Sequence, residues 1–285
     1  GLRRELVAAA YPLMLNHLLA TLFFKFDVFL LQRLWGETVL GWYSVSYKLV
    51  DAVGIIPPAF TMAIFPLMSR LASSSRESLH RAYVLSIKLL FTLALFIALL
   101  STALAYPLAG LMGGGAYLPH SAIALGIIVW YMPLGFINSV TQYVLIALDR
   151  QRFLMGAFAV GLASAVVANL LLIPRFGYRA AAAVHILAEL ALLIPFYVGV
   201  RRYLAPVPWA RLLWRPLAAA GVAGGFLWLL RSRLALVAPL GGGLYLALVL
   251  ALGTFGPEDR ALLLQVVPLE RLWQRLVRRL APRAP

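Results

Sequence analysis

Six ionisable side chains lie inside apolar stretches of this sequence, and each is a candidate for ligand binding or ion coupling. A charge at bilayer depth costs several kcal/mol unless it faces water or an opposite charge. The mixed signs indicate an aqueous cavity. The six residues are Lys25, Asp27, Lys48, Asp51, Lys88 and Glu189.

Helical spacing gathers some of these side chains with other polar groups. Residues three or four apart lie on one side of a helix, which groups Tyr47 and Lys48 with Asp51. Lys48 can therefore reach Asp51. The same spacing aligns Asn138 with Gln142 in a later stretch.

Two further stretches carry a polar face of the same kind. His185 and Glu189 are four residues apart, and so are Thr21 and Lys25. Four separate stretches thus each present one polar face. This pattern is expected when helices surround a central hydrophilic cavity.

A purely structural role stays open for most of these residues. The Lys48 and His185 pairs can be neutralised partners that only fix helix packing, and Asn138 and Gln142 can be hydrogen-bond donors between helices. Lys88 lies close to the cytoplasmic end of its stretch, so we expect it to extend to the interface. Lys25 has no obvious local partner, which favours an anionic ligand.

Enzymatic chemistry has no matching motif. The four histidines are scattered, and neither an HExxH metal motif nor a nucleophile elbow occurs. The chain contains no cysteine, which excludes disulfides, thiolate metal sites and cysteine nucleophiles. We therefore expect a protein that is not an enzyme and has no catalytic residues, metal site or cofactor.

Composition places these side chains in a membrane protein. The 285 residues are 63% hydrophobic and 12% charged, with a mean hydropathy of +0.90. A soluble fold of this size has too little interior for so much apolar surface, so lipid must cover the rest. The expected fold is an all-α, polytopic transmembrane helix bundle.

About 20 mostly apolar residues are needed for a helix to cross the hydrocarbon core. Eight stretches meet this requirement. They are roughly Leu6–Leu34, Trp42–Met68, Ala82–Leu108, Ser121–Leu148, Phe153–Ile173, Ala180–Val200, Leu212–Leu230 and Leu234–Phe255. Pro57 and Pro58, Pro133 and Pro195 interrupt the second, fourth and sixth of these and permit bends.

Net charge and its distribution give an orientation. The formal charge of +15 does not indicate a nucleic-acid partner, because the arginines sit in short gaps between apolar runs and form no continuous patch. If the N-terminus is cytoplasmic, 17 arginines fall on the cytoplasmic side and 5 outside. We therefore expect a multi-pass protein of the inner, cytoplasmic membrane, in contact with membrane lipids and with both termini cytoplasmic.

The end of the chain has a different pattern. Apolar residues recur at helical spacing between Leu269 and Leu280, with arginines on the other side. This predicts an amphipathic helix on the anionic membrane surface. We divide the chain into residues 1–203, a six-helix lobe, residues 204–257, two additional helices, and residues 258–285, a basic cytoplasmic tail.

Several motifs resemble those of a known family. They are FKFDVFLL at 24–31, VLGWYSVSYKLVD at 39–51, IFPLMSR at 64–70 and NLLLIPRFG at 169–177, followed by Glu189. This order resembles the opening of the C-terminal lobe of polysaccharide-biosynthesis, O-antigen-type flippases. These belong to the multidrug/oligosaccharidyl-lipid/polysaccharide exporter superfamily.

The resemblance implies a function and a place within a larger protein. It implies alternating-access export of an undecaprenyl-diphosphate-linked oligosaccharide from the inner to the outer leaflet, coupled to a proton or sodium ion. It also implies helices seven to fourteen of a fourteen-helix transporter, so we expect a fragment that lacks the N-terminal lobe.

Site residues follow from the same interpretation. The anionic lipid-linked sugar is expected to contact Lys25, Lys48, Tyr47, Asn138 and Gln142. The carboxylates expected to couple an ion, or to set the charge of the cavity, are Asp27, Asp51 and Glu189.

Other functions stay open at this point. A drug or metabolite exporter of the same superfamily needs a more acidic cavity, and Lys25 argues against it. A membrane glycosyltransferase or polymerase needs catalytic acids in a large outside loop, whereas the outside loops here are short. A non-transporting scaffold would have all its charges paired.

Overall fold

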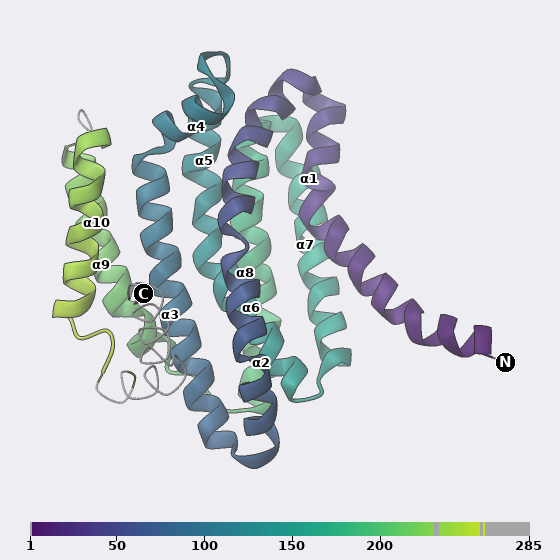
Figure 1. Cartoon of the computed structure of the whole chain (residues 1–285). Coiled ribbons are helices and arrows are strands. Elements are labelled where there is room, and N and C mark those ends of the chain that lie inside the picture. Colours follow the sequence, from purple (N-terminus) through teal and green to yellow (C-terminus); the bar gives the residue numbers. More distant parts are fainter. Residues whose placement is uncertain (1, 231–233, 257–258, 260–285) are drawn as a thin grey trace, which may run out of the picture.

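The computed structural model describes residues 2–230, 234–256 and 259, with side chains described from residue 25 onward except at 234–237. The described chain is a bundle of long helices (Figure 1). The predicted amphipathic helix at the end of the chain lies outside the described residues. The all-α, polytopic fold is confirmed.

The helices follow one another with short connections. They are α1 (Leu2–Val53), α2 (Ile56–Ser74), α3 (Arg76–Ala103), α4 (Ala105–Gly113), α5 (His120–Ile128), α6 (Met132–Ala147), α7 (Gln151–Phe176), α8 (Tyr178–Tyr203), α9 (Trp209–Leu229) and α10 (Leu234–Ala251), with 3-10 turns η1 (Gly115–Tyr117) and η2 (Val129–Tyr131). Each of the eight predicted stretches overlaps one or two of these α-helices.

A glycine reverses the direction of the chain within α1. Gly36 has φ 79° and ψ −179°, a backbone conformation that disfavours side chains. Residues 2–35 and 37–53 therefore form two antiparallel limbs (Figure 1). At this turn the Trp35 Nε1 donates a hydrogen bond of 2.9 Å to the Ile173 carbonyl, which fastens the turn to α7.

Prolines mark two of the predicted interruptions. The second stretch breaks between α1 and α2, and Pro57 and Pro58 stand in the first turn of α2. The fourth stretch is divided into α5 and α6 by the turn η2, immediately before Pro133. Pro195 lies inside α8 without ending it. Pro57, Pro58 and Pro133 each stand in the first turn of a helix, a position that suits proline.

The third predicted stretch, Ala82–Leu108, has the wrong ends. α3 begins at Arg76, where the Ser75 hydroxyl accepts a hydrogen bond of 3.2 Å from the Ser78 N–H. It ends at Ala103, and a separate helix, α4, follows. Hydropathy alone missed the polar first turn of α3, because that turn is set by its cap.

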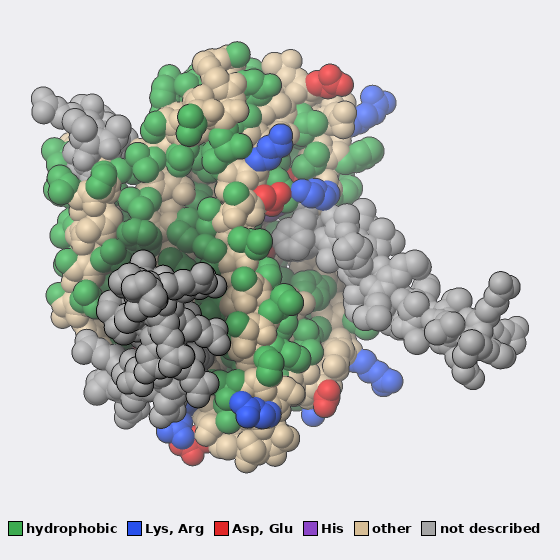
Figure 2. Space-filling model, viewed as in Figure 1, with side chains coloured by type: hydrophobic (Ala, Val, Ile, Leu, Met, Phe, Trp, Pro, Cys, Tyr) green, Lys and Arg blue, Asp and Glu red, His purple; other side chains and the backbone are tan. Residues whose placement is uncertain are grey.

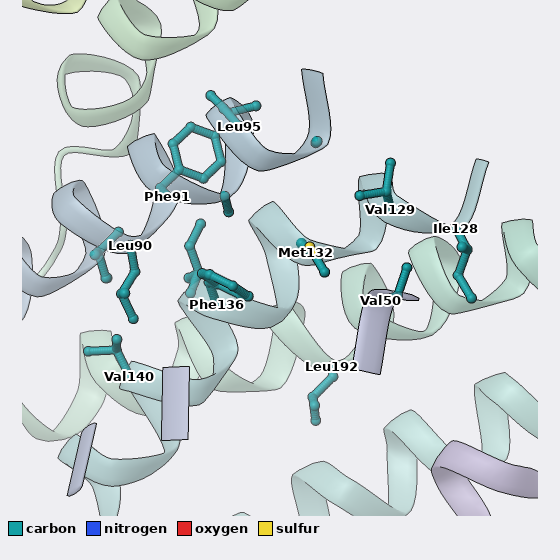
Figure 3. Packing of buried hydrophobic residues seen from close by; sticks show 14 of the residues in the cluster. Val50, Leu90, Phe91, Leu95, Ile128, Val129, Met132, Phe136, Val140 and Leu192 are labelled. Carbon is teal, nitrogen blue, oxygen red and sulfur yellow. The ribbon is translucent and has the colours of Figure 1, made fainter. Parts of the chain in front are cut away.

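The interior is made by α3, α5 and α6, with α1 and α8 against them. Figure 3 shows Leu90 and Phe91 of α3 beside Phe136 and Val140 of α6. These side chains are at most 4% exposed. Large aromatic and aliphatic groups therefore fill the contact between these two helices.

Hydrophobic side chains cover much of the face of the bundle that Figure 2 shows. Six helical stretches of the described chain are long and apolar enough to cross a membrane, and Ala238–Ala251 is a shorter apolar helix. The first of these stretches, Lys25–Ser74, includes both limbs at Gly36. An apolar exterior of this length matches a bilayer as solvent.

We expect Gly199→Ala to destabilise the bundle by about 1–3 kcal/mol. A Cβ at Gly199 of α8 would stand 2.5 Å from the Phe153 Cε1 of α7. Gly156→Ala is the control, since no atom lies within 4 Å of a Cβ there. Thermal unfolding of the two purified variants in detergent measures the difference. Equal melting temperatures would contradict the close packing of α7 on α8.

Candidate functional site

A buried carboxylate links both limbs of α1 to α8. Asp27, on the first limb, is 2% exposed and its Oδ2 lies 3.0 Å from the His185 Nε2 of α8. The Tyr43 hydroxyl of the second limb donates a hydrogen bond to the same oxygen. The other oxygen, Oδ1, is buried without a hydrogen-bond partner in the described residues.

Asp27 lies inside an apolar helical stretch long enough to cross a membrane. It precedes the turn at Gly36 by nine residues, which is about 14 Å of helix. With that turn at the membrane surface, the carboxylate would stand near the middle of a hydrocarbon core roughly 30 Å thick. A carboxylate at this depth needs the partners that His185 and Tyr43 provide.

Of the alternatives left open by the sequence, a neutralised pair of His185 with Glu189 is not the arrangement found. His185 pairs with Asp27, and Glu189 instead accepts a hydrogen bond of 2.7 Å from the Asn138 Nδ2 of α6. The same Nδ2 also donates to the Glu189 backbone carbonyl at 2.9 Å. Asn138 and Glu189 are 4% and 5% exposed. Asn138 thus acts between helices and satisfies a buried carboxylate.

The alternative in which Lys48 neutralises Asp51 is likewise not found, because Asp51 pairs with Lys25. The Lys25 Nζ lies 3.9 Å from the Asp51 Oδ2 and 4.1 Å from the centroid of the Tyr47 ring. The Lys25 and Asp51 side chains are 52% and 56% exposed. Lys48 is exposed and makes no ion pair with a residue that the structure describes.

Aromatic rings connect these polar groups. The Tyr47 ring lies 5.8 Å from Tyr43 and 5.7 Å from the His185 ring. The ring of Tyr131, in η2, lies 5.5 Å from the same His185 ring. A Cβ at Gly135 would lie 3.5 Å from the Glu189 Cδ and 3.3 Å from Tyr131, so this glycine leaves room for the carboxylate.

We call this group the polar cluster. It comprises Lys25, Asp27, Tyr43, Tyr47, Asp51, Tyr131, Asn138, His185 and Glu189. Basic and acidic side chains stand beside one another on the face seen in Figure 2. Gln142, which was expected near them, is half-buried and makes no hydrogen bond to a described residue.

Sequence reasoning missed Tyr43 and the role of His185. Neither was predicted as a site residue. His185 carried a signal, because an ionisable ring inside an apolar stretch needs a polar partner. Tyr43 carried none, since an aromatic residue in such a stretch is ordinary. Its partner became visible only once the turn at Gly36 placed the two limbs side by side.

Lys88 was expected to extend to the interface, and the structure differs. Its Nζ lies 2.5 Å from the Asp259 Oδ2, with side chains 16% and 17% exposed. Asp259 follows α10, 171 residues later in the chain. The lysine is therefore held by a partly buried ion pair.

The cluster offers two kinds of binding chemistry. Asp27 and Glu189 are buried carboxylates able to hold a proton or a cation, whereas Lys25 is an accessible cation suited to phosphate oxygens. Lys48, which lies outside the cluster as defined, is a second exposed cation. Among the described residues, no group of three or more His, Cys, Asp or Glu side chains is arranged to hold a metal ion. Binding and ion coupling fit these groups best.

One comparison with known proteins gives a match. Residues 12–172 match a family model described as MatE. The match covers more than half of the chain. No match was found among curated proteins or among solved structures. The matched range includes Lys25, Asp27, Tyr43 and Asn138 and ends before His185 and Glu189.

Proposed function

Because the chain belongs to the MatE family of membrane transporters, we propose that it flips an oligosaccharide linked to undecaprenyl diphosphate. The family makes it a multi-pass transporter of the multidrug/oligosaccharidyl-lipid/polysaccharide exporter superfamily. The lipid-linked sugar is our proposal within that class. Its diphosphate would be held by Lys25 of the polar cluster and by the exposed Lys48.

The observation that carries this proposal is that Lys25 and Lys48 are exposed cations within apolar helical stretches. Lys25 precedes Gly36 by 11 residues, and Lys48 follows it by 12. With the turn at the membrane surface, both would lie near the middle of a bilayer. Both are exposed, and Lys48 has no acidic partner among the described residues. A lysine in contact with lipid at this depth is unfavourable. Water and an anionic ligand would therefore occupy this face.

Ion coupling is proposed at Asp27. Its carboxylate is shared by both limbs of α1 and by α8 through Tyr43 and His185. Gain or loss of a proton or sodium ion there would change the attraction between these helices. Glu189, held by Asn138, is a second buried carboxylate four residues from His185.

A drug or metabolite exporter is the second candidate, and one observation favours it. The Lys25 ammonium lies within 3.9 Å of the Asp51 carboxylate, so its charge is partly neutralised. Two further carboxylates, Asp27 and Glu189, are buried in the same cluster. A net acidic site would hold an organic cation. Lys48 distinguishes the two candidates, because no acidic side chain in the described part of the chain pairs with it.

Genetic complementation tests the proposed substrate. The gene is expressed, with any further coding sequence that its reading frame contains, in a strain that lacks its own lipid-linked-sugar flippase. We expect surface polysaccharide to return and the lipid-linked precursor to stop accumulating. Resistance to cationic drugs without any return of polysaccharide would contradict the proposal and favour the drug exporter.

A further inference from the structure

α9 and α10 form a hairpin whose main helix neighbour is α3. In Figure 1 this hairpin stands at the edge of the bundle, beside α3. At one end Ala103 of α3, Leu227 of α9 and Ala238 of α10 pack into a small buried cluster. The hairpin therefore has its own packing contact, separate from the polar cluster.

The contact between α10 and α3 continues along both helices in antiparallel register. A Cβ at Gly242 would lie 3.2 Å from both the Phe96 and the Leu100 side chains, so α10 approaches α3 closely there. One turn further, the Tyr245 hydroxyl donates a hydrogen bond of 2.9 Å to the Thr92 carbonyl. Tyr245 is fully buried. Small residues and one buried hydroxyl thus align the two helices.

Polar and charged contacts hold the other end of the contact between α10 and α3. The Lys88 ammonium, one turn before Thr92, lies 2.5 Å from the Asp259 carboxylate. The same carboxylate oxygen accepts a hydrogen bond of 2.9 Å from the Gly256 N–H. The Arg215 side chain of α9 donates to the Gly253 carbonyl. The segment after α10 is thus bound to both α3 and α9.

The ion pair differs from an ordinary surface pair. The Arg81 pair with Glu77, on the same helix α3, has a distance of 3.8 Å and side chains 56% and 81% exposed. The Lys88 and Asp259 side chains are 16% and 17% exposed. Water screens a partly buried pair less, and removal of one partner leaves the other without compensation.

We propose that the Lys88–Asp259 pair is a latch that holds α9 and α10 on α3, so that the three helices move as one body during transport. The α3 helix also meets α6, where the Tyr83 hydroxyl lies 2.8 Å from the Thr141 Oγ1. Thr141 is three residues after Asn138 of the polar cluster. The latch therefore fixes the hairpin to a helix that contacts the site.

Spin-label distance measurements on the full chain in lipid nanodiscs test the latch. The chain has no cysteine, so Leu93→Cys on α3 and Leu250→Cys on α10 place two labels at exposed positions, 37% and 66% exposed. We expect one narrow distance distribution with the pair intact. Lys88→Glu and Asp259→Lys should each broaden it, and the two together should restore it.

Two sets of variants keep this test decisive. Glu77→Arg disrupts the exposed pair with Arg81 and should leave the distribution narrow. If a charge reversal is not produced in membranes, Lys88→Gln and Asp259→Asn remove the charges at similar size and should also broaden it. Narrow distributions in the single variants, or a broad one in the combined reversal, would overturn the latch.

Discussion

Replacement of Asp27 by leucine is expected to lower the free energy of unfolding by about 3–5 kcal/mol. The change leaves the His185 imidazole and the Tyr43 hydroxyl buried without the oxygen that they share. Asp51→Leu is the matched control, since its partner is half-exposed and 3.9 Å away. We expect it to cost less than about 1 kcal/mol. Reversible unfolding of the purified variants in detergent measures both.

A second variant separates a purely structural role of Asp27 from a role in binding the coupling ion. Asp27→Leu with His185→Leu removes the stranded imidazole together with the carboxylate and should recover part of the lost stability, while the Tyr43 hydroxyl still lacks its partner. Transport should nevertheless stay absent, because no carboxylate remains at this position to bind the coupling ion. Normal transport by this stable double variant would show that Asp27 serves only packing.

Replacement of both Lys25 and Lys48 by alanine is expected to abolish transport. Both cations are exposed, and neither is needed to fill the interior. Protein levels in the membrane should therefore stay normal. Lys25→Arg should retain activity, since a guanidinium also binds phosphate oxygens. Transport rates normalised to membrane protein provide the measurement.

Controls for the lysines address the ion pair with Asp51. If Lys25 only neutralises Asp51, then Lys25→Met with Asp51→Leu should transport normally, because both charges are removed together. If Lys25 holds the substrate, that double variant should be inactive. Arg81→Ala, which removes an exposed cation of α3, should have no effect in either case.

Apolar length and turn residues made the helices predictable from the sequence. A stretch of about 20 apolar residues has few alternatives to a spanning helix, because lipid leaves backbone groups unsatisfied in any other form. The reversal at Gly36 fell between two predicted stretches. The break between α3 and α4 at Leu104 was missed, since neither glycine nor proline stands there.

The pairing of charges was not predictable in the same way. Spacing along one helix shows which side chains share a face, and it correctly grouped Tyr47 with Asp51 and His185 with Glu189. Which charged side chain a residue pairs with depends on the helices packed beside its own. Asp27 reaches His185 across 158 residues of sequence, and Asn138 takes the place that spacing had assigned to His185. Local spacing contains no information on such contacts.

Direct binding of the lipid carrier tests the central claim. Undecaprenyl diphosphate is added to the purified protein in detergent, and native mass spectrometry measures the bound fraction. Loss of a hydrogen bond to a charged group costs about 1.5–3 kcal/mol, so each lysine should contribute roughly tenfold or more in affinity. We predict binding to the wild-type protein and to Arg81→Ala, and binding weaker by roughly a hundredfold or more to Lys25→Ala with Lys48→Ala. Equal binding by that double variant would contradict a cationic site for the diphosphate.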